Sequence, residues 1–343
     1  MNAVEFDNVS IVFGPDPQAA LPLMDEGQSR EDIQRATGQV LGVHNCSIDV
    51  KEGEILVLMG LSGSGKSTLL RAVNALNPVA RGEVRVFDGD KMTSVSKADA
   101  QELRKLRQTR IAMVFQQFGL LPWRTVRENA GLGLELAGVE GSELISRVDT
   151  QLELVGLQDW AERKVGELSG GMQQRVGLAR AFATEAPILL MDEPFSALDP
   201  LIRTRLQDEL LELQRLLKRT IVFVSHDLDE AFKLGDRIAI MEGGRIVQAG
   251  TPREIYSNPI NEYVADFVAH MNPLGVLCAH DVMQPLTGAH AQNVAGNTDI
   301  QDLMNILQNG PTAIGVTGAN GTIIGEVTRD TVLRGLLRQE PST

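Results

Sequence analysis

The stretch "EILVLMGLSGSGKSTLL", residues 54–70, decides the fold of this chain. Its apolar first part is typical of a buried strand, its middle fits the pattern G-x-x-x-x-G-K-[ST], and its end begins a helical run. A strand, a glycine-rich loop and a helix in this order predict the front of a parallel sheet in an α/β fold. Glycines let backbone N–H groups approach phosphate oxygens, so the loop is predicted to bind phosphates. A flexible glycine turn is the alternative, and the flanking strand and helix argue against it.

The residues that follow the last glycine of this loop add a charge and a metal ligand. Lys66 supplies a point charge for the β- and γ-phosphates of a nucleotide, and the Ser67 hydroxyl is a ligand for Mg²⁺. The octahedral shell of Mg²⁺ keeps waters, which other groups of the protein must hold. The residues predicted to surround the phosphates are Gly60, Leu61, Ser62, Gly63, Ser64, Gly65, Lys66, Ser67 and Thr68.

Two later apolar runs, "PILLMD" at 187–192 and "TIVFVSHD" at 220–227, end in polar residues. Such runs are typical of strands that helices bury on both faces, and catalytic groups gather at the carboxyl ends of these strands. Asp192 is therefore predicted to hold the water shell of the metal, and Glu193 to orient or deprotonate the attacking water. A solvated loop is the alternative for an Asp-Glu pair, but the apolar strand before it favours the catalytic interpretation.

Gln116 and His226 each end another apolar run, "IAMVFQ" and "IVFVSH". The amide of Gln116 is predicted to touch the metal or the attacking water at the same edge of the sheet. A single histidine is more often a structural hydrogen-bonding residue than a catalytic one. The functional interpretation of His226 therefore depends on its place among the other motifs.

The composition restricts partners and compartment. The chain has 45 acidic and 32 basic residues and a net charge of −13, which argues against nucleic acid as a partner. Cys46 and Cys278 lie far apart and suggest neither a disulfide framework nor a metal site, which fits a reducing compartment. The N-terminal residues lack the pattern of an export leader, and no run approaches about 18 uncharged apolar residues. We therefore expect a cytoplasmic protein that acts at a membrane only through a partner.

The 343 residues suggest two domains. Alternating apolar residues at 4–13 predict a strand, which Gly14, Pro15 and Pro17 then interrupt. Breakers in "HMNPLG", 270–275, mark a second boundary. The predicted parts are a first domain over 1–269 with an insert over 14–38 and a helical subdomain at about 118–180, a linker over 270–277, and a second domain over 278–337.

Six motifs occur in one order along the chain: the loop at 60–68, Gln116, "LSGGMQQR" at 168–175, "ILLMDEP" at 188–194, "SALD" at 196–199, and His226. Their order resembles the ATP-binding subunits of ATP-binding cassette (ABC) transporters, over residues 4 to about 268. The resemblance implies a P-loop NTPase fold of the ABC-ATPase type, with a RecA-like parallel sheet, an antiparallel β subdomain and a helical subdomain. It also implies an ATPase that uses ATP and Mg²⁺, with Ser67, Gln116 and Asp192 at the metal.

The resemblance further explains why one chain carries two anion-binding segments, the loop at 60–68 and "LSGG" at 168–171. In this family two copies dimerise head to tail, and the second segment of one copy closes on the γ-phosphate held by the other. The implied roles are ATP contact in trans for Ser169, Gly170 and Gly171, a place on the dimer seam for Asp199, and contact with the γ-phosphate for His226, beside Glu193. Phe13 matches an aromatic residue that stacks on adenine, although it could equally be a core residue.

The insert, "TGQVLGVHNCSIDV" at 37–50 and the appended domain resemble the branch that serves uptake of quaternary amines such as glycine betaine and choline. This implies a homodimer on the inner face of the cell membrane, bound there through a multi-spanning permease and served indirectly by a substrate-binding protein. Trp123 could pack against the permease, or it could be an interior residue. The alternatives are a soluble ABC ATPase not tied to transport and a nucleotide-sensing regulator.

Residues 278–337 resemble a single cystathionine-β-synthase-like (CBS) module, a small α+β domain. The predicted parts include an amphipathic helix with Ile300, Leu303, Met304 and Leu307, a hairpin at 318–321 and a closing helix. The resemblance implies that two such modules pair across the dimer axis. A ligand-binding or ionic-strength-sensing role and a merely dimer-stabilising or vestigial one remain open. Attachment to lipid is expected to be weak, because Arg329, Arg334 and Arg338 are the only Lys or Arg residues after 270.

Overall fold

The computed structural model describes residues 1–269, 271–288, 290, 292–318 and 320–337. Residue 270 of the predicted linker, residue 319 of the predicted hairpin and Arg338 lie outside these ranges. The described residues form two compact units. The first comprises Met1–Asp227 with Leu234–Ala249, and the second comprises Leu228–Lys233 with the described residues from Gly250 onward. Within these residues, no helix has both the length and the apolar character that crossing a membrane requires.

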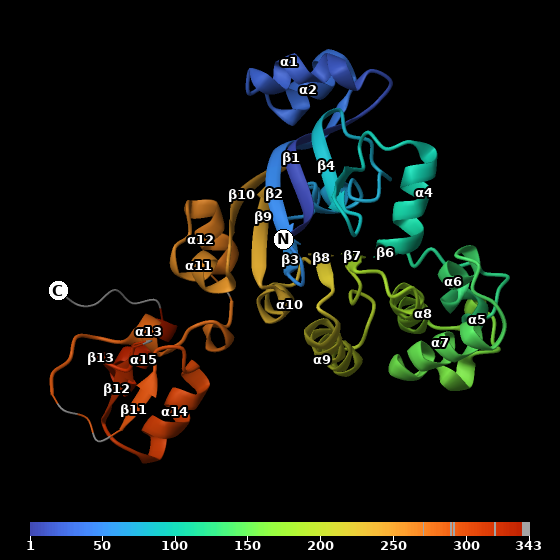
Figure 1. The fold of residues 1–343 in the computed structure, drawn as a ribbon. Coiled ribbons are helices and arrows are strands. Elements are labelled where there is room, and N and C mark those ends of the chain that lie inside the picture. The colour runs from blue at the N-terminus through green and yellow to red at the C-terminus, as the bar shows by residue number, and fades with distance from the viewer. Residues whose placement is uncertain (270, 289, 291, 319, 338–343) are drawn as a thin grey trace. The chain divides into compact units, whose positions relative to one another are not determined.

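The first unit contains a six-stranded sheet in the order β10-β9-β3-β8-β7-β6 (Figure 1). Pairing is parallel from β9 through to β6, which confirms the predicted parallel sheet. Every residue of β3, β7 and β8 is buried, as expected for strands covered on both faces. The strands are β3 (Ile55–Met59), β6 (Ile111–Val114), β7 (Ile188–Asp192), β8 (Thr220–Val224), β9 (Arg237–Glu242) and β10 (Arg245–Gly250).

An antiparallel sheet in the order β2-β1-β4-β5 packs against the parallel sheet. Val4 and Phe6 from this sheet share one hydrophobic core with Leu56 and Val222 of the parallel sheet. The two sheets therefore hold each other in place through common apolar burial. The strands are β1 (Asn2–Phe13), β2 (Val40–Lys51), β4 (Arg81–Phe87) and β5 (Met92–Ser94).

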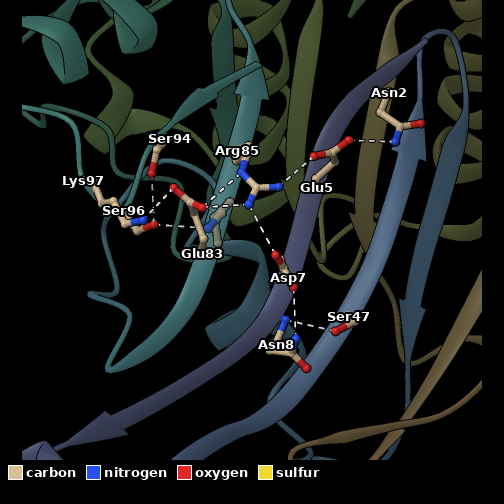
Figure 2. A network of polar contacts seen from close by, with 11 residues as sticks. Asn2, Glu5, Asp7, Asn8, Ser47, Glu83, Arg85, Ser94, Ser96 and Lys97 are labelled. Atoms are coloured by element: carbon tan, nitrogen blue, oxygen red, sulfur yellow. Dashed lines mark hydrogen bonds and ion pairs between the residues drawn. The ribbon is translucent and has the colours of Figure 1, made fainter.

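A polar network covers the open face of the antiparallel sheet (Figure 2). Arg85 of β4 forms ion pairs with Glu5 at 3.2 Å, Asp7 at 3.3 Å and Glu83 at 2.7 Å. Hydrogen bonds from the Ser94 hydroxyl and from Arg85 lower the pKa of Glu83 to about 2. The positive charge of Arg85 is therefore neutralised by the carboxylates next to it.

The insert is folded and has a small core of its own. Its elements are η1 (Pro17–Ala20), α1 (Leu21–Asp25) and α2 (Arg30–Thr37), which lie at the end of β1 and β2 in Figure 1. The Ser29 side chain caps α2, and Gly38 ends it in the left-handed region at φ 72°. Ile33 is fully buried among apolar side chains of the insert and of the adjoining strands, namely Val12, Ala20, Met24 and Leu41.

The residues from 115 to 187 contain only helices as regular elements. Capping boxes begin two α-helices of the first unit, at Asp99 and at Thr125, so these helix starts are set locally. The helices of the first unit outside the insert are α3 (Lys66–Leu70), α4 (Ala100–Thr109), α5 (Val126–Ala130), α6 (Leu132–Leu136), α7 (Gly141–Leu154), η2 (Gln158–Trp160), η3 (Val165–Glu167), α8 (Gly170–Ala183) and α9 (Pro200–Leu217).

The second unit has a three-stranded sheet in the order β11-β12-β13, parallel and then antiparallel. The predicted amphipathic helix forms as α14, where Ile300, Leu303 and Leu307 are buried but Met304 is 42% exposed. The remaining elements are α11 (Pro252–Ser257), α12 (Glu262–Val268), η4 (Pro273–Gly275), α13 (Ala279–Val282), β11 (Asn293–Ala295), α14 (Ile300–Asn309), β12 (Ala313–Thr317), β13 (Ile323–Thr328) and α15 (Arg329–Leu336), with α10 (Leu228–Leu234) at the division between the units.

Candidate nucleotide site

The glycine-rich loop joins β3 to α3, as the sequence predicts. Gly60 and Gly65 have φ values of 141° and 100°, a region that other residues rarely adopt. A Cβ atom on Gly60 would clash with the Met241 carbonyl oxygen, and one on Gly65 would lie 2.7 Å from the Gly42 carbonyl oxygen. Glycine is therefore needed at both positions, and the bare backbone leaves room for a phosphate to approach.

Lys66 lies inside the curve of this loop. Its Nζ donates to the carbonyl oxygens of Gly60 at 2.8 Å and Leu61 at 3.0 Å. Burial lowers the pKa of Lys66, while the charges of Glu193 and Asp192 act in the opposite direction. No ion pair joins Lys66 to a carboxylate in the described part of the chain, so its charge remains available to an anion.

The two predicted metal ligands Ser67 and Asp192 meet directly. Asp192 is fully buried, and its Oδ1 accepts a hydrogen bond of 2.6 Å from the Ser67 hydroxyl. Its Oδ2 accepts from Arg71 Nε at 3.1 Å and Nη2 at 2.8 Å. Arg71 was not among the residues predicted from the sequence, although its spacing of four residues from Ser67 could have indicated a side chain on the same helical face.

Three further predicted residues lie together near the carboxyl ends of β6, β7 and β8. Gln116 Nε2 donates to Glu193 Oε2 at 3.0 Å, and His226 Nδ1 lies 3.5 Å from the same oxygen. Glu193 itself has a φ of 49°, which turns the chain sharply after β7. A carboxylate held by an amide and an imidazole is suited to accept a proton from water.

These groups surround a cavity of about 600 Å³ in the first unit. Phe13 is 38% exposed and lines this cavity, so it is not a core residue. Asp192 lies behind Ser67 rather than on the wall. The predicted residues that line the cavity are Phe13, Ser62, Gly63, Gly65, Lys66, Ser67, Thr68, Gln116, Glu193 and His226, and the lining residues that the sequence analysis missed are Arg30, Val40, Leu41 and Gly42.

Ser169, Gly170, Gly171 and Asp199 do not belong to the residues that line this cavity. The Ser169 hydroxyl caps α8 by accepting from the Met172 N–H at 3.4 Å, and Asp199 caps α9 by accepting from the Ile202 N–H at 3.1 Å. Within one chain these residues begin helices. Their predicted contact with ATP in a second copy stays a prediction.

Gln174 connects the segment at 168–175 to the cavity, and the sequence analysis missed it. It is buried, its Nε2 donates to the Glu193 carbonyl oxygen at 3.1 Å, and its Oε1 accepts from the Ala197 N–H at 3.0 Å. The start of α8 is thus joined to the turn that carries Glu193. A glutamine inside an otherwise apolar face of α8 is the signal that could have indicated such a contact.

The residues present fit a nucleotide with Mg²⁺. Lys66 and Arg30 line the cavity without a carboxylate partner among the described residues, and Ser64 Oγ and Arg30 Nε are buried without a hydrogen-bond partner. Oxygen groups of Ser67 and Asp192 stand together, and oxygen is the ligand that Mg²⁺ prefers. The cations, the orphaned donors and the oxygen pair all suit a phosphate chain with its metal.

Comparison with known proteins agrees with this geometry. The pattern of the family described as "ABC transporter" matches residues 43–196. The chain is 45% identical over 338 residues to the glycine betaine/proline betaine transport system ATP-binding protein ProV of Escherichia coli (strain K12), covering 98% of this chain and 83% of the relative. It is 43% identical to the trimethylamine N-oxide transport system ATP-binding protein TmoW of Ruegeria pomeroyi, covering 96% of each.

A solved structure shares the fold. The dimeric structure of MJ0796, a bacterial ABC transporter cassette, superposes with a TM-score of 0.63 at 31% identity and covers 73% of this chain and 99% of that one. A second structure of the same cassette is a post-hydrolysis state bound to ADP and Pi, with a TM-score of 0.63 at 32% identity. The predicted ABC-ATPase fold and the ATPase activity with ATP and Mg²⁺ are confirmed. This chain belongs to the ABC transporter family, as an ATP-hydrolysing, ATP-binding subunit.

Proposed function

We propose that this chain energises a membrane importer for quaternary ammonium osmolytes, glycine betaine, choline or their relatives. The relatives named above belong to transport systems for glycine betaine, proline betaine and trimethylamine N-oxide, all small methylated amines. The observation that carries the energising role is the grouping of Lys66, Ser67 and Glu193 around one cavity, with Asp192 bonded to Ser67 behind the wall. The sequence similarity to betaine carriers supports the substrate class.

The site residues divide the work of hydrolysis. The loop at 60–68 and Lys66 hold the phosphates, and Ser67, Asp192 and Gln116 are the residues that would hold Mg²⁺, directly or through its waters. Mg²⁺ neutralises charge on the β- and γ-phosphates when it is bound. Glu193 accepts the proton of the attacking water, and Gln116 keeps that carboxylate in place through the bond of 3.0 Å. His226 steadies the γ-phosphate beside Glu193, and Phe13 stacks on adenine.

The working unit that we propose is a head-to-tail homodimer. Ser169, Gly170 and Gly171 lie outside the cavity wall of their own chain, so an anion-binding role for them needs a second copy. The cassette with the similar fold is described as dimeric. Asp199 then lies on the seam between the copies, and ATP-driven closure followed by hydrolysis-driven reopening supplies the motion for transport.

A permease partner accounts for the membrane role. Trp123 is 69% exposed and so is not an interior residue, which supports a contact between its indole ring and the permease. The dimer would thus sit on the cytoplasmic side of the membrane, held by the permease and served indirectly by a substrate-binding protein. The CBS-like module at 278–337 would add a second contact between the two copies. The compact unit that contains this module also includes the helices from Pro252 to Val268.

Co-expression with a candidate permease tests this proposal. We expect the chain to co-purify with the multi-spanning subunit and to support ATP-dependent uptake of labelled glycine betaine into vesicles. A Glu193→Gln chain should co-purify equally well but support no uptake. A Trp123→Ala chain should hydrolyse ATP but co-purify poorly. Uptake that persists with Glu193→Gln, or a chain that stays unbound beside every such permease, would contradict the proposal.

A further inference from the structure

Arg30 reaches the cavity from the insert, a segment that precedes the phosphate loop by more than twenty residues. It is the first residue of α2, which is fixed at both ends by the Ser29 cap and by Gly38. The fully buried Ile33 anchors the same helix in the small core that the insert shares with β1 and β2. The direction of the Arg30 side chain is therefore set by packing rather than left free in solvent.

The Arg30 guanidinium bridges two walls of the cavity. Nη1 donates to the Gly63 carbonyl oxygen in the phosphate loop at 2.7 Å, and Nη2 donates to the Gly42 carbonyl oxygen in β2 at 2.7 Å. A Cβ atom on Gly244 would lie 2.5 Å from Nη2, so the guanidinium occupies a narrow slot. Both acceptors are neutral, and no ion pair joins Arg30 to a carboxylate in the ranges that the structure describes.

Arg35, on the same helix, shows the contrast. Its Nη1 pairs with Asp32 Oδ1 at 3.1 Å, and its side chain is 76% exposed. That pairing is the usual arrangement for a surface arginine and contributes little. Arg30 instead remains an unneutralised cation on the wall of a cavity that takes a polyphosphate, where its planar fork suits two fixed acceptors.

We propose that Arg30 is a positioning residue for ATP: it ties the phosphate loop at Gly63 to strand β2 at Gly42, and so gives the insert over residues 14–38 a part in nucleotide binding. The inference rests on the proposed role of residues 60–68 as the ATP loop. A glycine-rich loop loses conformational freedom when it closes on phosphates, and a loop already held at Gly63 loses less. The positive charge of Arg30 adds attraction for the phosphate chain.

The test measures the affinity of the purified full chain for Mg-ATP and Mg-ADP, together with KM and kcat. Arg30→Met keeps the length of the side chain and removes the fork and the charge. We expect it to weaken binding of both nucleotides about tenfold, because the loop loses its tether and the cavity loses a positive charge, and to raise KM while kcat at saturation is retained. Arg35→Met is the matched control on the same helix and should bind both nucleotides like wild type.

Arg30→Lys keeps the positive charge but removes the two-point hydrogen bonding to Gly63 and Gly42, so it tests the two effects separately. A lysine carries the charge but cannot donate from two points of one plane, so its affinity should stay clearly below wild type. Wild-type affinity in Arg30→Lys or in a folded Arg30→Met would overturn the inference, as would an equal loss in Arg35→Met. Lys66→Ala tests the underlying assignment: if it binds ATP normally the loop is not the ATP loop, whereas a loss in Lys66→Ala without one in the Arg30 variants refutes the inference alone.

Discussion

Two groups of basic side chains in the first unit are held in opposite ways. Arg85, on the open face of the antiparallel sheet, is surrounded by the carboxylates of Glu5, Asp7 and Glu83 (Figure 2). Among the described residues, Lys66 and Arg30 at the cavity donate only to backbone carbonyl oxygens. The difference teaches how a basic residue can be stabilised yet left available, because a neutral acceptor fixes its geometry without cancelling its charge.

The largest effect should come from Glu193, the carboxylate on the cavity wall that Gln116 and His226 hold. Glu193→Gln preserves the shape and the contact with Gln116 but removes the proton acceptor. We expect hydrolysis to slow about 10²–10⁴-fold while ATP binding is retained, so that the variant accumulates as an ATP-dependent dimer. Phosphate release and size-exclusion chromatography measure the two parts. Steady-state release near the wild-type rate would rule out this role.

The next prediction concerns whether Lys66 of one copy and Ser169 of the other copy contact the same ATP. Lys66→Ala and Ser169→Arg should each abolish hydrolysis alone. In a mixture of the two chains, both defects fall in one composite site of a mixed dimer, so about a quarter of all sites are intact and part of the activity returns.

A crosslink decides the case if the mixture stays inactive. Ser67→Cys with Ser169→Cys should form a disulfide between chains in the presence of ATP, and the native Cys46 and Cys278 are buried and do not interfere. An inactive mixture with this crosslink means that the two sites are strictly coupled. An inactive mixture without it means that the motif does not act in trans.

A smaller effect, on stability rather than on hydrolysis, is expected when Arg85 is replaced. Arg85→Met should lower the free energy of unfolding only slightly, since the network is exposed to solvent, and should leave ATP affinity unchanged. The Lys97→Met control removes a single pair with Glu83 and should cost less. Thermal and urea unfolding measure both variants. A change in ATP affinity in Arg85→Met would break the distinction between the two groups of cations.

The difference in the free energy of unfolding between wild type and Arg85→Met should depend on pH through Glu83. Its pKa is lowered to about 2 in the folded protein by Ser94 and Arg85, so the stability gained from ionised Glu83 is present above the ordinary pKa of about 4.3 and is lost as the pH falls toward 2. We therefore expect the gap in stability between wild type and Arg85→Met to be full at neutral pH and to close below about pH 4. A gap that widens in acid would contradict this assignment.

The smallest effect on hydrolysis is expected from the second unit. Truncation after Met271 removes the predicted CBS-like module and should leave basal hydrolysis unchanged, because every residue that lines the cavity lies in the first unit. It should weaken dimerisation, measured by sedimentation at several concentrations. Complete loss of hydrolysis in a folded truncation would refute this division, and salt-dependent activation that disappears on truncation would indicate ionic-strength sensing instead.

The sequence predicted those parts of the fold that depend on local pattern. Continuous apolar residues at 55–59 and 188–191 became fully buried strands, and the polar residues after them gathered at one edge of the sheet. Gln116 follows β6 by two residues rather than ending it, because the strand stops at Val114. Its amide still reaches Glu193 from that short loop.

The missed residues depend on contacts between distant segments. Arg30 meets Gly63 only because Ile33 and Met24 pack the insert against β1 and β2, and no periodicity in the sequence shows that packing. Gln174 of α8 bonds to the backbone of Glu193, which follows β7. No fixed spacing between these two residues marks the contact in the sequence. Side chains that bond to the backbone of another segment leave no pattern of residue types, since every residue offers the same carbonyl oxygen.

The bond between Gln174 and the turn at Glu193 has a consequence for timing. In the proposed dimer, α8 of one copy covers the ATP of the other, while Glu193 of that same copy acts on its own ATP. Gln174 bonds both to the Glu193 carbonyl oxygen and to the Ala197 N–H. In such a dimer, a shift of the Glu193 turn after hydrolysis would therefore move the start of α8 and change its contact with the ATP of the other copy.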